Sequence, residues 1–239
     1  MAMVRLKYDF RQQVPETLDI YLYSDVEPAY TDWWTGERQD EGSTEAFRRQ
    51  LDEHPDAKRI NLYVNSYGGD VKEGYGIYAI LKRHAAKKVA YVDGIAASIA
   101  SIICMAADEV VMYKNSVMII HNMGMGVFGN ANELRKAADD LDKMMEGNRQ
   151  IYLDKAGEKL TEEQLTEMLD AETTLSAADA LAYGLCDVIT DAAIDTHAPA
   201  GAQEAIRKLI ANQPKPPAKE RALKFWGNKN KEEKKNAES

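Results

Sequence analysis

Residues 94–99, with the sequence GIAASI, join a strand-like run (residues 88–92, KVAYV) to an apolar, alanine-rich stretch typical of a helix. Small side chains make up this turn, so Ser98 would stand at a helix N-terminus with open space in front of it. The N–H groups of a first helical turn have no partner within the helix and can hold a negative charge. A serine at such a turn is either a helix N-cap or a nucleophile, and this segment alone favours the cap.

A histidine follows at the end of another strand-like run. Residues 117–120, VMII, lead directly into His121, 23 residues after Ser98. The other histidines occupy positions typical of helix ends or linkers: His54, His84 and His197. A serine on a strand-to-helix turn, with a histidine at a strand end, is typical of acyl-transfer sites. The pair favours a nucleophile at Ser98 and a general base at His121.

A second strand-to-helix turn precedes the first. Residues 60–71, INLYVNSYGGDV, contain a strand-like run followed by Gly68 and Gly69. Paired glycines let backbone N–H groups face a ligand without an intervening side chain. Asp70 and Glu73 have the spacing of a capping box that would open the next helix. One turn could therefore supply the nucleophile and the other an oxyanion donor.

Several segments resemble, in order and spacing, the ClpP family of serine peptidases: residues 64–69 (VNSYGG), 94–98 (GIAAS), 115–121 (NSVMIIH), 175–177 (LSA) and 182–187 (AYGLCD). The chain is similar to this family over about residues 18–190, and most similar to the phage and prophage branch of head maturation proteases. The resemblance implies an α/β fold, a ClpP/crotonase-like spiral of ββα units with a projecting helical handle. It also implies polypeptide substrates and no cofactor.

The family's functional positions map onto this chain as the nucleophile Ser98, the general base His121, and the oxyanion N–H groups of Gly69 and Ile99. The triad acid, counted back from the Ser-Ala pair, falls on Glu172, and Asp170 is the alternative two residues upstream. Ser101, nearly one turn further into the helix, is expected to be dispensable.

The chain departs from the family pattern at several places. Tyr67 replaces the proline before the glycine pair, and residues 122–123 are Asn-Met where the family usually has Gln-Pro. Thr173 replaces an arginine that helps to join two rings in the family. The resemblance implies a ring, of seven subunits or two stacked sevens, and the threonine predicts weaker stacking. An AAA+ unfoldase or a capsid or scaffold protein would be the partner.

The coarse pattern is β then α, repeated. Strands are expected near residues 18–24, 60–65, 88–93, 109–113, 117–121 and 186–190. An amphipathic helix is expected over residues 130–155, closed by Gly157, and another is capped by Thr161 and Gln164. The segment around Trp33 and Trp34 gives no clear pattern.

Charge divides the 239-residue chain. Residues 198–239 hold ten Lys or Arg and five Asp or Glu, so this tail has a net charge of +5. The rest of the chain has a net charge of −14, and the whole chain has a net charge of −9. We expect an N-terminal segment (1–17), a peptidase domain (18–197) and a disordered basic tail (198–239), whose Leu223, Phe225 and Trp226 could alternatively dock on a partner. The acidic body disfavours nucleic acid as a substrate.

The remaining patterns argue for a cytoplasmic protein. The N-terminus lacks a signal-peptide pattern, and the longest apolar stretch, residues 94–107, is too short to span a membrane and predicts a core helix. Cys104 and Cys186 lack metal-ligand spacing and predict buried thiols. Two other classes remain open: a crotonase-like acyl-CoA enzyme, which would not need Ser98, and an inactive ring scaffold. A Ser-Lys dyad peptidase is a further variant.

Overall fold

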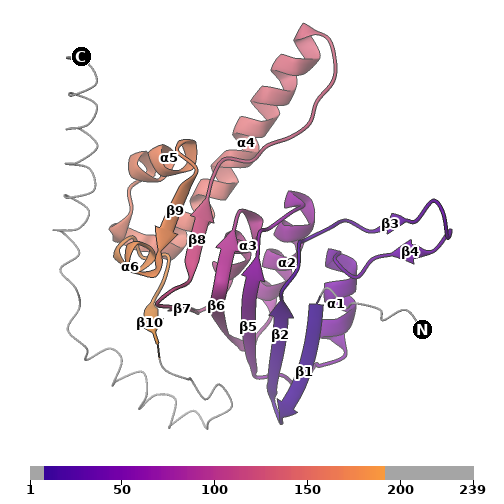
Figure 1. Ribbon diagram of the computed structural model, residues 1–239, viewed down its shortest axis with the longest axis vertical. Helices are drawn as coiled ribbons and strands as arrows, with labels where there is room; N and C mark the ends of the chain where they lie inside the picture. The colour runs from indigo at the N-terminus through magenta and orange to yellow at the C-terminus, as the bar shows by residue number, and fades with distance from the viewer. Residues whose placement is uncertain (1–7, 192–239) are drawn as a thin grey trace. The chain divides into compact units, whose positions relative to one another are not determined.

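The computed structural model describes residues 8–191 of the chain, so the predicted basic tail at 198–239 lies outside the described residues. The main sheet has the order β1 (Tyr8–Val14), β2 (Thr17–Leu22), β5 (Arg59–Ser66), β6 (Lys87–Ala97), β7 (Glu109–Tyr113) and β10 (Val188–Thr190). β1 pairs antiparallel with β2, and the other neighbours along this path are parallel. Figure 1 shows these strands side by side. The mixed α/β architecture, with a mostly parallel sheet, confirms the predicted fold class.

Alternation along the strands separates two apolar layers. Leu18, Ile20 and Leu22 of β2 face a large core in which Phe47 of α1 (Thr44–Asp52) and Ile77 of α2 (Val71–Arg83) are buried. The opposite face carries a smaller cluster, in which the rings of Tyr21, Tyr63 and Tyr91 stack in sequence. The helical layer therefore covers one face of the main sheet, and tyrosines line the other.

The long strand β6 belongs to two parts of the sheet. Its first half pairs with β5 and β7, whereas Ile95–Ala97 pair with β8 (Val117–Ile120). Gly94 lies at the change of partner, where a Cβ atom would come within 2.6 Å of the Asn65 side-chain oxygen. β8 in turn pairs antiparallel with β9 (Thr173–Ser176). This second group of strands leads the chain from the main sheet to the region of Ser98 and His121.

The helix after β6 is shorter than the sequence predicts. The apolar run at residues 94–107 was expected to form one core helix, but residues 94–97 are strand and α3 spans only Ile99–Cys104. Pairing with β8 satisfies the backbone groups of residues 95–97, so the apolar composition reflects burial in a strand there. All residues of α3 are buried.

The expected capping box at α2 is only half formed. Asp70 accepts the N–H of Glu73, but the Glu73 carboxylate accepts the N–H of Thr44, at 2.8 Å, instead of returning to Asp70. The Glu73 carboxylate therefore makes a tertiary hydrogen bond to α1 in place of the local hydrogen bond to the Asp70 N–H. The box at Thr161 and Gln164 is complete and opens α5 (Glu162–Asp170).

The helix α4 (Ala131–Ala156) confirms the long helix predicted at 130–155, with a capping box at Asn130 and Gly157 at its C-cap. Its buried residues, Met145, Asn148, Tyr152 and Ala156, all lie in its C-terminal half. Figure 1 shows the N-terminal half extending beyond the strands. This arrangement matches the handle that the resemblance implied. After α4 come a 3-10 turn, η1 (Gly157–Lys159), and finally α6 (Ala177–Ala182).

A small hairpin accounts for the segment without a predicted pattern. Its strands are β3 (Tyr30–Thr31) and β4 (Arg38–Gln39), and the Asp32 side chain accepts the N–H groups of Trp34 and Thr35 at the tip. Both tryptophans are exposed, Trp33 by 87% and Trp34 by 80%. This hairpin, β1 and β9 are strands that the sequence pattern did not predict.

Candidate active site

The candidate residues meet where parallel strands end. Gly68 and Gly69 follow β5, Ser98 follows β6 and His121 follows β8. Because these three strands are parallel neighbours, their carboxyl ends lie on the same side of the sheet. Loops beyond such ends are a common location for ligand sites in α/β sheets.

Ser98 has an unusual backbone conformation for a serine. Its φ is 54° and its ψ is −130°, and its side chain makes no capping hydrogen bond to α3. Ser98 therefore occupies the N-cap position of α3, as the alternative interpretation has it, but its side chain does not cap the helix. A non-glycine residue in such a sparsely populated region costs on the order of 1–3 kcal/mol and persists only where the surroundings impose it. Strain of this kind is typical of a nucleophile on a strand-to-helix turn.

The first glycine of the pair lies against the serine turn. A Cβ atom on Gly68 would lie 2.8 Å from the Ser98 Cβ atom and 2.7 Å from the Ala97 carbonyl oxygen. Gly68 also has φ of +100°, which other residues rarely adopt. Only a glycine allows the two turns to approach this closely.

The second glycine is held by the chain that precedes the hairpin. Val26 donates its N–H to the Gly68 carbonyl at 2.7 Å and accepts the Asp70 N–H at 2.8 Å. These two hydrogen bonds flank Gly69, whose φ is +136° and whose own N–H donates to none of the groups of residues 8–191. Ile99 is the first residue of α3, so its N–H also lacks a helical partner. The two expected oxyanion donors are therefore both unused in the described structure.

His121 is half-buried, and one of its ring nitrogens is engaged. Its Nδ1 lies 2.6 Å from the backbone carbonyl oxygen of Asn122. A carbonyl can only accept, so we assign the proton to Nδ1, which leaves Nε2 of a neutral ring as an acceptor. An imidazole with a free Nε2 lone pair is the form that a general base requires.

The two candidate acids differ in their contacts. Asp170, at the end of α5, accepts a hydrogen bond from the Asn122 side-chain amide at 2.7 Å. It thus contacts the residue that follows His121 in the chain. Glu172 is exposed, has φ of 48°, and lies just before β9. Ile120 and Thr173 are the last pair of the antiparallel ladder of β8 and β9, so His121 directly follows one strand and Glu172 directly precedes the other.

No hydrogen bond within residues 8–191 joins Ser98 to His121, or His121 to either carboxylate. Catalytic hydrogen bonds in unliganded enzymes are often long and tighten only when substrate binds. Asn122 is the contact that sequence analysis missed, because a backbone carbonyl leaves no signal in residue type.

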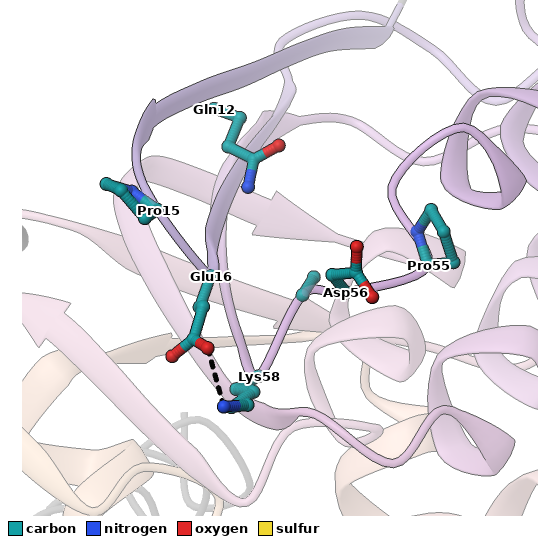
Figure 2. Close-up of a pocket in the computed structure, with 7 residues that line it drawn as sticks. Gln12, Pro15, Glu16, Pro55, Asp56 and Lys58 are labelled. Carbon is teal, nitrogen blue, oxygen red and sulfur yellow. Dashed lines mark hydrogen bonds and ion pairs between the residues drawn. The ribbon is translucent and has the colours of Figure 1, made fainter.

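A depression in the surface lies elsewhere. Figure 2 shows it lined by Gln12, Pro15, Glu16, Pro55, Asp56 and Lys58, with an ion pair of 2.5 Å between Glu16 and Lys58. These residues precede β2 and β5, whereas the candidate residues follow the strands. The depression is therefore at the opposite edge of the sheet and is no part of the candidate site.

Comparison with known families agrees with this geometry. The model of the Clp protease family matches residues 37–193, more than half of the 239-residue chain. The chain belongs to the Clp protease family. Clp proteases are serine-type peptidases, act on polypeptides and typically form oligomeric rings. The matched range includes Ser98, His121 and both candidate acids.

Among residues 8–191, no helix is both long enough and apolar enough to cross a membrane. The same residues contain no group of three or more His, Cys, Asp or Glu side chains arranged to hold a metal ion.

Proposed function

We propose that this Clp protease family member is a serine endopeptidase in which Ser98 is the nucleophile and His121 the general base. The observation that carries the proposal is the strained Ser98 backbone at the carboxyl edge of the sheet, with φ of 54° and a side chain that does not cap α3. A structural serine at a helix start would gain stability by capping the helix, and Ser98 does not do so.

The mechanism follows from these groups. Nε2 of His121 takes the Ser98 hydroxyl proton as the oxygen attacks a peptide carbonyl. The N–H groups of Gly69 and Ile99 hold the resulting oxyanion, an interaction whose loss typically lowers the rate about 10²–10³-fold per donor. His121 then gives its proton to the leaving amine, and water repeats the sequence on the acyl-enzyme.

Glu172 is our choice for the acid that orients His121. The pairing of β8 and β9 supports it, because His121 and Glu172 are the residues that adjoin the last pair of this ladder, Ile120 and Thr173. Asp170 is the second candidate, supported by its 2.7 Å contact with Asn122. The Asn122 carbonyl already favours the required tautomer, so the carboxylate would chiefly stabilise the imidazolium that forms during the reaction.

The physiological assembly is proposed to be a heptameric ring with weak ring-to-ring stacking. Apolar side chains on the loop before α4 and on α4 itself are exposed in the single chain: Met125, Val127, Phe128, Leu134 and Met144. An exposed apolar strip of this kind is typical of a subunit interface. Thr173, in place of the family's ring-joining arginine, supports weak stacking.

The sequence motifs favour head maturation of a phage or prophage as the biological role, with capsid or scaffold protein as substrate. A housekeeping Clp subunit that receives substrates from an AAA+ unfoldase is the alternative. Incubating the purified protein with capsid or scaffold protein and, separately, with an AAA+ unfoldase and a folded substrate distinguishes the two roles.

A fluorophosphonate probe tests the chemistry. We expect stoichiometric labelling of the wild-type protein at Ser98, and hydrolysis of a fluorogenic peptide that Ser98→Ala abolishes. Ser116→Ala is the matched control, since Ser116 is a buried serine in the turn between β7 and β8, and its hydroxyl donates to the Tyr113 carbonyl. Labelling retained in Ser98→Ala would reject the assignment.

Two other classes predict different results in the same experiment. A crotonase-like enzyme would leave Ser98 unlabelled and turn over an acyl-CoA thioester. An inactive scaffold would form rings with neither labelling nor turnover.

A further inference from the structure

A chain of hydroxyl groups runs from the handle helix to the proposed nucleophile. Ser101 Oγ lies 2.6 Å from the backbone carbonyl oxygen of Ser98 and 2.6 Å from the hydroxyl oxygen of Tyr152 on α4. Both side chains are almost completely buried, with 0% of Ser101 and 1% of Tyr152 exposed. The N-cap carbonyl of α3, Ser101 within α3 and Tyr152 of α4 therefore form one continuous hydrogen-bonded chain.

The chemistry of the groups fixes the direction of this chain. The Ser98 carbonyl can only accept, so Ser101 donates its single hydroxyl proton to it. Ser101 Oγ then has only lone pairs left for Tyr152, and the phenol must donate. Burial raises the pKa of Tyr152, so the phenol keeps the proton that it donates.

The carbonyl that receives these hydrogen bonds belongs to the same peptide unit as the Ile99 N–H. A peptide unit is planar and rigid, and its C=O and N–H point in opposite directions. The Ser98 carbonyl accepts from the Ser101 N–H, at 3.0 Å, as well as from Ser101 Oγ. Holding this oxygen therefore fixes the direction of the Ile99 N–H.

We propose that Ser101 and Tyr152 are positioning residues that hold the Ser98–Ile99 peptide unit so that the Ile99 N–H points into the oxyanion site. This inference rests on the proposed function and revises the expectation that Ser101 is dispensable. Neither side chain touches the reacting atoms. Tyr152 acts through Ser101, and Ser101 acts through the Ser98 carbonyl.

The same face of α4 also contacts the loop that follows His121. Met145 Sδ accepts the backbone N–H of Met123, at 3.3 Å, and Met145 lies seven residues, about two helical turns, before Tyr152. One face of α4 is thus linked through Ser101 to the peptide unit of the nucleophile, and is bonded directly to the loop that follows the base. Because the N-terminal half of α4 is exposed, contacts made by the handle can reach both groups through a single rigid element.

Tyr152→Phe, Ser101→Ala and the double variant test the proposal, each assayed with a fluorogenic peptide and with the fluorophosphonate probe. We expect kcat to fall about tenfold in Tyr152→Phe and about a hundredfold in Ser101→Ala, approaching the loss of one oxyanion donor, with KM within twofold of wild type. The double variant should match Ser101→Ala, since both residues act through one contact. Labelling rates should fall in the same order.

Tyr8→Phe is the matched control. Tyr8 is a buried tyrosine whose hydroxyl donates to the Gly42 carbonyl, and the hydroxyl chain does not include it. The Tyr8→Phe variant should lose about as much free energy of unfolding as Tyr152→Phe, while its kcat stays unchanged. Equal kcat values in Tyr152→Phe and wild type would overturn the positioning role, as would additive effects in the double variant. Failure of the wild-type protein to label at Ser98 would instead overturn the proposed function itself.

Discussion

The backbone N–H of Ser98 donates to the carbonyl oxygen of Ile119 over 2.8 Å. Ile119 is two residues before His121, so this hydrogen bond continues the pairing of β6 with β8 up to the proposed nucleophile. The separation of nucleophile and base is therefore set by backbone register rather than by flexible loops. Sites built on strand ends hold their geometry more accurately than sites built on loops.

Gly68→Ala should inactivate the protein. The new Cβ would lie 2.8 Å from the Ser98 Cβ and would sit at φ of +100°, so the glycine turn must shift away from the serine turn. We expect at least a hundredfold loss of peptide hydrolysis, because the Gly69 donor moves with the turn, and a loss of about 1–3 kcal/mol in the free energy of unfolding.

Gly147→Ala is the control for that substitution. Gly147 lies within α4, with no atom within 4 Å of an added Cβ. Alanine there should stabilise the protein by about 0.5–1 kcal/mol and leave hydrolysis unchanged. Urea denaturation and peptide hydrolysis measure both variants. Wild-type activity in Gly68→Ala would contradict the role of the glycine turn.

Glu172→Gln should lower kcat about 10²–10⁴-fold if Glu172 stabilises the imidazolium. Asp170→Asn should have little effect, because an asparagine oxygen can still accept the Asn122 amide that Asp170 now binds. Assays on a small ester and on a peptide compare the two variants. A deep loss only in Asp170→Asn would transfer the role to Asp170, and no loss in either would indicate a Ser98–His121 dyad.

The buried thiols should make the fold less stable at alkaline pH. Burial raises the pKa of Cys104, and likewise that of Cys186, from 9.0 to about 12. Between pH 9 and 12 the unfolded chain loses thiol protons that the folded chain keeps. Unfolding then releases protons, and the free energy of unfolding falls as pH rises, by up to about 1.4 kcal/mol per pH unit for each thiol.

Urea denaturation at pH 8, 9 and 10 measures this dependence. Cys186→Ala should show a shallower decline than wild type, whatever its stability at pH 8. Iodoacetamide should fail to label either thiol in the folded protein at pH 8, since both are buried and protonated. An identical decline in Cys186→Ala and wild type would show that other groups cause it.

Light scattering should report an assembly of about seven chains of 26.7 kDa at micromolar concentration. Phe128 is fully exposed in the single chain, and replacing it by Ser removes apolar area from the strip around α4. We expect Phe128→Ser to raise the protein concentration below which the assembly dissociates, without unfolding the subunit. A wild-type protein that stays monomeric would contradict the proposed ring.

The sequence by itself determined most of the regular structure. Apolar runs at residues 60–65, 109–113 and 117–121 form strands within one or two residues of the predicted bounds, because they are too short for typical helices and are rich in β-branched residues. The long helix was equally clear, since Asn130 and Glu133 cap it locally and Gly157 ends it. The glycine pair, Ser98 and His121 stood out for the same reason, as each follows such a run.

Tertiary structure alone decided the contacts that depend on distant residues. Residues 94–97 form strand rather than helix because β8 pairs with them. The Glu73 carboxylate accepts the Thr44 N–H instead of completing a local capping box. β1, whose apolar alternation stops after Phe10 at Gln12, forms a strand because β2 offers it a partner edge. The hydroxyl chain from Tyr152 to Ser98 joins residues 54 positions apart, and nothing in the sequence between them signals it. Local patterns determine elements because their energies arise within a few residues, whereas the positioning of the site arises from long-range packing that only the folded chain possesses.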